Sequence, residues 1–128
     1  MNGRRQVPRG FTLIELLVVM AIISTLLMLA VPRYLRSLDR AREATLRQDL
    51  AVMREAMDKH LADTGRYPES LADLVSGHYL RSVPVDPFTH SADSWVLVPS
   101  DNPEVPGMRD VLSGAAGQSE GGAPLAEM

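Results

Sequence analysis

One uninterrupted apolar run limits what this chain can fold into. Between residues 11 and 31 the only polar side chains are Thr12, Glu15, Ser24 and Thr25. An α-helix of this length extends about 30 Å, which is the thickness of the hydrocarbon core of a bilayer. The run therefore predicts a helix that can span a membrane. Residues 32–128, fewer than 100 in number, remain for a small, loop-rich globular part.

The charges around this run indicate its orientation and exclude a nucleic-acid surface. Residues 1–10 contain Arg4, Arg5 and Arg9 and no acid, and without them the net charge falls from −3 to −6. Positive charge favours the cytoplasmic side of a membrane. An acidic body with 5% aromatic residues argues against binding nucleic acid. A secretory signal peptide also starts basic, but its apolar region is usually only about 7–15 residues long.

Glu15 is the unexpected residue of the apolar run. An acid inside lipid costs about 2.5 kcal/mol or more, so a carboxylate there usually has a partner or a function. The alternative is that Glu15, four residues after Phe11, reaches the headgroups and water. The residues alone leave both interpretations open.

The stretch RGFTLIELLVVMAII, residues 9–23, resembles the class III signal and helix start of type IV pilins and of the pseudopilins of type II secretion. The resemblance implies that a prepilin peptidase cleaves between Gly10 and Phe11 and methylates the new amino group of Phe11. It also implies that Glu15 meets the α-amino group of Phe11 on a neighbouring subunit during assembly. Every subunit carries both halves of this pair, so the contact is heterologous and generates an open helix.

A second helical segment follows Pro32. Because Pro32 lacks a backbone N–H, we expect a kink or local melting around residues 28–32. Residues 32–65 then predict one amphipathic arm with apolar side chains at steps of three and four. These are Leu35, Leu38, Leu46, Leu50, Met53, Met57 and Leu61. Ion pairs at i,i+4 spacing are predicted on its exposed sides. They are Glu43 with Arg47, Arg54 with Asp58, and Glu55 with Lys59.

The rest of the chain predicts a short helix and a small sheet. Ser70 and Asp73 have the spacing of a capping box. Strands are expected at Ser94–Val98 and Arg109–Leu112, with Trp95 anchoring the sheet on the arm. Residues 113–128 are rich in glycine and alanine, which indicates a loop and a flexible tail.

Together these segments predict an α+β, pilin-like "lollipop": a long N-terminal helix, half transmembrane and half amphipathic, packed on a small antiparallel sheet. The expected organisation is a leader at 1–10, a transmembrane and assembly helix at 11–31, the arm at 32–65, and a periplasmic globular part at 66–128. That last part should hold the short helix, two or three strands and the tail.

TGRYP at 64–68 and YLRSVPVDPF at 79–88 are similar to the G-type major pseudopilins. Many type IV pilins close their C-terminal loop with a disulfide, which a chain without cysteine cannot form. The G-type resemblance instead implies a calcium ion at that loop. The acids near it are sparse, and a calcium site from Asp110, the Ser113 carbonyl and Glu120 is one interpretation. A metal-free or disordered tail is the other, and no further cofactor is expected.

The implied function is structural: a subunit, not an enzyme, of the periplasmic pseudopilus that drives protein export by type II secretion. Expected partners are further copies in a helical filament, minor pseudopilins, prepilin peptidase and the inner-membrane assembly platform. The chain should cross the bacterial inner membrane once, with its N-terminus cytoplasmic and its C-terminal part periplasmic. The alternatives are a major or minor pilin of a type IV pilus and, from another class, a membrane-anchored periplasmic binding or adaptor module. No catalytic residue is predicted.

Overall fold

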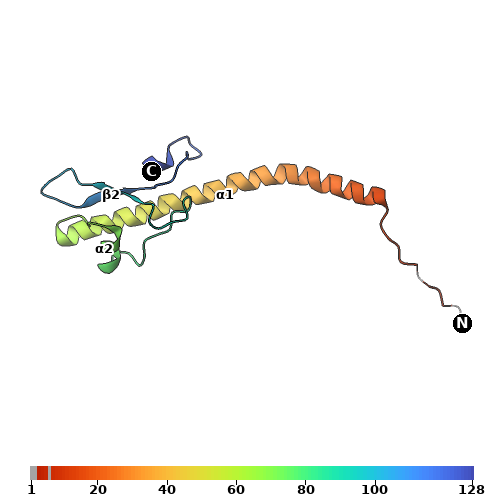
Figure 1. The fold of residues 1–128 in the computed structure, drawn as a ribbon, viewed down its shortest axis with the longest axis horizontal. Helices are drawn as coiled ribbons and strands as arrows, with labels where there is room; N and C mark the ends of the chain where they lie inside the picture. Colours follow the sequence, from red (N-terminus) through yellow and green to blue (C-terminus); the bar gives the residue numbers. More distant parts are fainter. Residues whose placement is uncertain (1–2, 6) are drawn as a thin grey trace. The chain divides into compact units, whose positions relative to one another are not determined.

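A computed structural model describes residues 3–5 and 7–128, and it has the predicted α+β architecture. The elements are the helices α1 (Leu13–Thr64) and α2 (Leu71–Ser76), the strands β1 (Val96–Pro99) and β2 (Met108–Leu112), and a 3-10 turn, η1 (Leu125–Glu127) (Figure 1). The chain divides into two units, Met1–Ser37 and Leu38–Met128. Part of the predicted leader, residues 1, 2 and 6, lies outside the described residues.

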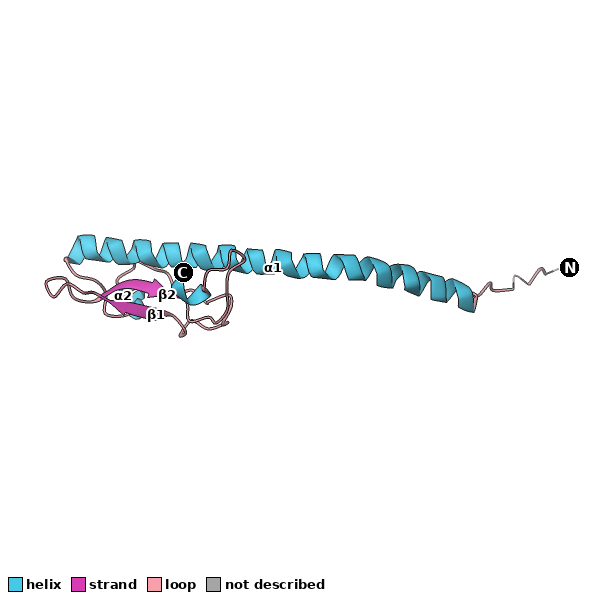
Figure 2. Ribbon diagram, turned by 90° about the horizontal axis from the view of Figure 1, so that it is seen from above, coloured by secondary structure: helices cyan, strands magenta, loops and turns pink. Residues whose placement is uncertain are grey.

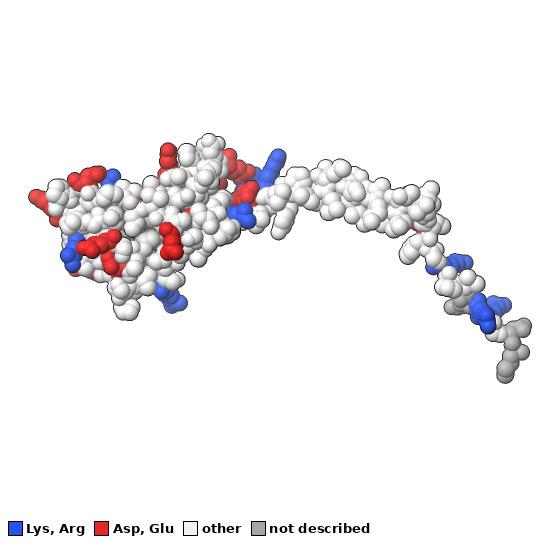
Figure 3. All heavy atoms as spheres, viewed as in Figure 1, with Lys and Arg blue, Asp and Glu red and all other residues white. Residues whose placement is uncertain are grey.

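The first unit presents the apolar half of α1. Within the described residues, α1 is the one helix long and apolar enough to cross a membrane, with a stretch of mean hydropathy 2.6 that is not buried inside the protein. On the face shown in Figure 3, this stretch is almost entirely free of charged side chains. The hydroxyls of Ser24 and Thr25 donate to the carbonyls of Met20 and Ala21, at 2.7 and 2.8 Å. These polar groups are therefore satisfied within the helix, as a lipid environment requires.

The local melting expected near Pro32 is absent, because α1 continues through this residue without a break. Proline removes only one N–H from the hydrogen-bond ladder of a helix, and the residues on both sides can keep their own bonds. Residues 28–32 are all helical. The kink at Pro32 stays a prediction.

The second unit has its core on one side of α1. The sheet and α2 lie along this half of the helix (Figure 2). Four predicted arm positions are at most 1% exposed: Leu46, Leu50, Met53 and Met57. They share a cluster with residues from every later element or its edge: Leu71, Leu74, Leu80, Trp95, Val111, Ala115 and Leu125. The apolar stripe is shorter than predicted, since Leu35 and Leu38 are 53% and 36% exposed.

β1 and β2 form a two-stranded antiparallel sheet. Val96 pairs with Leu112 at one end, Pro99 pairs with Met108 at the other, and the register shifts between Val98 and Pro99. Strand β1 begins two residues later than predicted, and β2 begins one residue earlier. Both predicted strands are confirmed.

Backbone contacts tie the loop before β2 to the chain that follows α1. The N–H of Tyr67 donates to the carbonyl of Pro106 at 3.0 Å, and that of Met108 donates to Pro68 at 2.8 Å. Gly107 has a φ of +114°, and a Cβ at this position would lie 2.4 Å from the carbonyl oxygen of Tyr67. Only glycine fits so close an approach.

The predicted capping box of α2 is confirmed. The N–H of Asp73 donates to the Ser70 hydroxyl at 3.3 Å, and the N–H of Ser70 donates to the Asp73 carboxylate at 3.1 Å. Two backbone donors at the start of this helix of six residues are thereby satisfied.

The C-terminal segment, residues 113–128, is anchored in the core at a few residues, and its predicted flexibility stays a prediction. Ala115 and Leu125 are 4% and 2% exposed in the core. A bridge joins Gln118 to Pro124, and η1 follows it. The composition of this segment indicates a loop, but burial of these two apolar side chains holds it against the core. Which side chains are buried depends on contacts that form only in the folded chain.

Candidate functional sites

The peptide bond between Gly10 and Phe11 lies in a segment without regular structure, just before α1. Phe11 is 91% exposed. No heavy atom lies within 4 Å of the position that a Cβ on Gly10 would occupy. The bond is thus accessible to a protease, and packing inside this chain gives no reason for glycine at residue 10.

Glu15 belongs to a capping box at the start of α1. Its N–H donates to the Thr12 hydroxyl at 3.2 Å, and its carboxylate accepts the N–H of Thr12 at 3.3 Å. The carboxylate therefore has a partner in its own chain and lies at the positive end of the helix dipole. The sequence interpretation missed this role, although the spacing T-x-x-E of residues 12–15 is a recognised signal for it.

Glu15 also borders a shallow groove on the side of α1. The other residues that line the groove are all apolar: Phe11, Ile14, Val18 and Val19. A carboxylate beside such a surface would be desolvated as soon as a lipid tail or another apolar helix covered the groove. Desolvation strengthens the attraction of a carboxylate for a cation. The arrangement can therefore bind an ammonium group brought in by a second molecule.

The three residues of the predicted calcium site each contact a different part of the protein. The Asp110 carboxylate accepts the Arg54 Nε–H at 2.7 Å, and that of Glu120 accepts the Arg40 Nε–H at 2.6 Å. The buried hydroxyl of Ser113 donates to Asp86. The two carboxylates named for the ion are thus already bound to arginines of α1.

The two arginines that hold these carboxylates lie far apart along α1. Arg40 and Arg54 are 14 residues apart in α1, which places their backbones about 21 Å apart. Calcium ligands lie about 2.3–2.6 Å from the ion and hence within about 5 Å of one another. Because the Asp110 and Glu120 carboxylates are each taken by a different arginine, this donor set does not fit one calcium ion. Within the described ranges, no three His, Cys, Asp or Glu side chains form a metal-binding group.

Asp86 has a role that the sequence interpretation missed. The Asp86 carboxylate accepts the N–H groups of Phe88 and Thr89, at 2.8 and 3.3 Å, which is typical of a turn. The residue is also fully buried and accepts the hydroxyl of Ser113, which begins the C-terminal segment. These two residues are 27 positions apart, and no local pattern indicates such a pair.

Three ionisable groups of the second unit have shifted pKa values. Partial burial, together with the nearby Asp86 carboxylate, raises the pKa of Asp49 above its ordinary value. A hydrogen bond to Asp63 raises the pKa of the Tyr79 hydroxyl. The hydrogen bond to Glu120 raises the pKa of Arg40. Each shift has a structural cause in packing or pairing.

Two of the three predicted ion pairs along α1 are confirmed. Arg47 lies 2.6 Å from Glu43, and Lys59 lies 2.9 Å from Glu55. Arg54 contacts Asp110 of β2 instead of Asp58. Asp110 replaces Asp58 as the partner because the Arg54 guanidinium can there reach three acceptors. These are the Asp110 carboxylate and the carbonyls of Val111 and Met128.

The chain is similar to known proteins at both the motif and the whole-chain level. The family described as the prokaryotic N-terminal methylation motif matches residues 6–31. The type II secretion system core protein G of Klebsiella pneumoniae is 32% identical, over 78% of this chain and 81% of that protein. The protein of the same name from Escherichia coli is 31% identical, over 82% and 79%, and that from Vibrio cholerae is 30% identical, over 88% and 84%. No solved structure matches.

Proposed function

We propose that this chain, which belongs to the family of type II secretion system core protein G, is cleaved and N-methylated at Phe11 and then assembles through Glu15. The protein is a pilin-like structural subunit of the pseudopilus. The N-terminal methylation motif and the apolar α1 indicate that it is anchored in a membrane. Processing, pairing and orientation are the further steps of the proposal.

The observation that carries the proposal is the position of Glu15 beside the Gly10–Phe11 bond. Cleavage there would create an α-amino group on Phe11, four residues from a carboxylate that borders an apolar groove. A buried carboxylate without a cation is strongly destabilising, whereas a paired one is tolerated. In a filament, the amino group of one subunit and the Glu15 carboxylate of the next would satisfy each other. Because each subunit offers both groups, the contact repeats along an open helix.

The proposed orientation follows from charge. Arg4, Arg5 and Arg9 would keep the leader in the cytoplasm, where a prepilin peptidase would cut it. Residues 11–31 would cross the inner membrane once, and the second unit would lie in the periplasm. Extension of the filament, built from copies of this chain with minor pseudopilins on an inner-membrane platform, would drive export. In this scheme the chain is a substrate of processing enzymes and catalyses nothing itself.

Two variants test the scheme in cells that express the full secretion system. Gly10→Ala should remain unprocessed, so mass spectrometry should find the leader attached and Phe11 unmethylated. Glu15→Gln should be cleaved, methylated and inserted, yet the sheared filament fraction should contain little of it. Ser24→Ala is the matched control in the same apolar stretch, because that hydroxyl bonds only within the helix.

Normal filaments from Glu15→Gln would contradict the proposed pairing. A membrane-anchored binding module would also tolerate that change, and it would form no filaments in either version. Long, retractable surface fibres made mostly of this chain would instead indicate a type IV pilin.

A further inference from the structure

Three arginines of α1 recur at intervals of seven residues: Arg40, Arg47 and Arg54. Seven residues make almost two turns of a helix, so these side chains leave α1 on nearly the same side. We call them the arginine row. Two of them contact β2 or the C-terminal segment directly, and the third contacts Glu43, which itself reaches that segment.

Arg54 makes the most contacts in the row. Its Nε–H donates to the Asp110 carboxylate at 2.7 Å, and its Nη2 donates to the carbonyls of Val111, at 3.0 Å, and of Met128. The side chains of Arg54 and Asp110 are only 38% and 40% exposed. A planar guanidinium can serve several acceptors at once with little loss of freedom. One side chain thus joins α1 to β2 and to the far end of the C-terminal segment.

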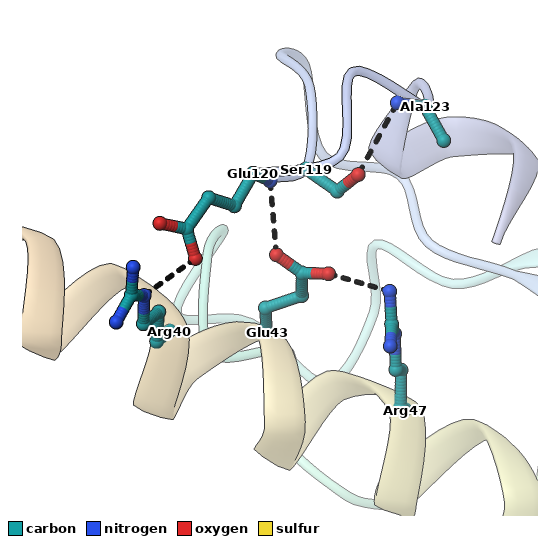
Figure 4. Close-up of polar contacts among 6 residues, drawn as sticks. All are labelled: Arg40, Glu43, Arg47, Ser119, Glu120 and Ala123. Atoms are coloured by element: carbon teal, nitrogen blue, oxygen red, sulfur yellow. Dashed lines mark hydrogen bonds and ion pairs between the residues drawn. The ribbon is translucent and has the colours of Figure 1, made fainter.

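Arg40 and Arg47 act near the middle of the C-terminal segment, at Glu120, through two glutamates (Figure 4). The Glu120 carboxylate accepts Arg40 at 2.6 Å, while the Glu120 N–H donates to Glu43 at 3.1 Å. Arg47 holds the second oxygen of Glu43 at 2.6 Å. The C-terminal segment is therefore bound at Glu120 through both the side chain and the backbone N–H of this residue. The side chains of Arg40, Arg47 and Glu120 are more exposed than that of Arg54, so their ion pairs should contribute less.

We propose that the arginine row fastens the C-terminal segment to α1 without a metal, in the place of the calcium ion that the G-type resemblance implies. Two of the acids in or beside this segment, Asp110 and Glu120, are bound to guanidinium groups. An ion that took either carboxylate would leave an arginine without its acceptor, which is costly where the group is partly buried. The arginine side chains hold these carboxylates by charge, as a bound calcium ion would, and no metal is required.

The test uses the full chain in detergent and measures amide hydrogen exchange of residues 113–128. Adding millimolar calcium, or a calcium chelator, should change the exchange rate of the wild type by less than about twofold. Arg54→Gln should exchange about tenfold or more faster there, because several charge-assisted hydrogen bonds are lost. Arg54→Lys keeps the charge but not the forked geometry, and it should fall between the two.

Arg42→Gln is the matched control. It lies on the same helix, and its ion pair is a 3.8 Å contact with Asp39 on α1 itself, so residues 113–128 should exchange at the wild-type rate. Peptides from α2 should also be unchanged in Arg54→Gln, which separates local loosening from global unfolding. Slower exchange with calcium, or wild-type exchange in both Arg54 variants, would overturn the proposal. Neither readout depends on processing or assembly, so the proposed function is tested separately.

Discussion

Replacing Trp95 by alanine should unfold the second unit or bring it close to unfolding. Trp95 is 8% exposed within the core formed by α1, α2 and the sheet. Removing a buried aromatic side chain of this size costs about 3–5 kcal/mol. Its indole N–H also donates to the Pro84 carbonyl at 2.8 Å, and leaving that partly buried acceptor unpaired adds up to about 1–3 kcal/mol. The sum is comparable with the whole stability of a small domain, about 5–15 kcal/mol.

Trp95→Phe separates the two contributions, because it keeps most of the ring volume and loses the N–H. We expect it to cost clearly less than Trp95→Ala, with the lost hydrogen bond as its main component. Trp95 is the only tryptophan, so its fluorescence disappears in both variants. Pulse proteolysis across a urea series of the full chain in detergent can measure all versions alike.

Val96→Ala is the control for Trp95, since it is the next residue and is 49% exposed. It should change the unfolding free energy by less than about 0.5 kcal/mol. A cost of less than about 1 kcal/mol for Trp95→Ala would refute the packing described here. So would equal costs for the alanine and phenylalanine variants, because the ring would then contribute nothing beyond its hydrogen bond.

Two further changes test other parts of the second unit. Gly114→Ala should cost about 1–3 kcal/mol in urea unfolding, since its Cβ would lie 2.1 Å from the carbonyl oxygen of Ser94; wild-type stability would contradict this contact. Asp49→Asn should stabilise the protein at pH 7 by at most about 1 kcal/mol at this partly exposed position, because the raised pKa of Asp49 means that its charge is disfavoured in the folded state. This cost is complete above the folded pKa and disappears below the ordinary value of 3.8, so melting curves of the two versions should converge in acid.

Local patterns predicted most of the elements. The periodic apolar residues indicated both halves of α1, and the capping spacing at Ser70 and Asp73 indicated α2. The strand boundaries were shifted by one or two residues, since the register of a hairpin depends on pairing as well as on composition. The helix at Pro32 continued because one missing donor is a small loss within 52 residues.

Contacts distant in sequence were harder to predict. The i,i+4 spacing predicted that Arg54 pairs with Asp58. In the folded chain, β2 brings the Asp110 carboxylate and the Val111 carbonyl close to Arg54 instead. The same reason explains why Ser113 and Asp86 were not linked and why Leu125 was assigned to a loose tail. The capping role of Glu15 differs from these contacts, because its partner Thr12 is only three residues away and the T-x-x-E spacing alone could have predicted it.

The capping box of Thr12 and Glu15 also affects the precursor. It fixes the start of α1 at Leu13 and so prevents the apolar helix from winding backwards through Gly10 and Phe11. Proteases cut extended, exposed chain far more readily than helix. In the scheme proposed here, the same glutamate would first keep the leader junction open to the peptidase and afterwards bind the amino group that the cut releases. Glu15 would thus act twice in each subunit, once before cleavage and once after it.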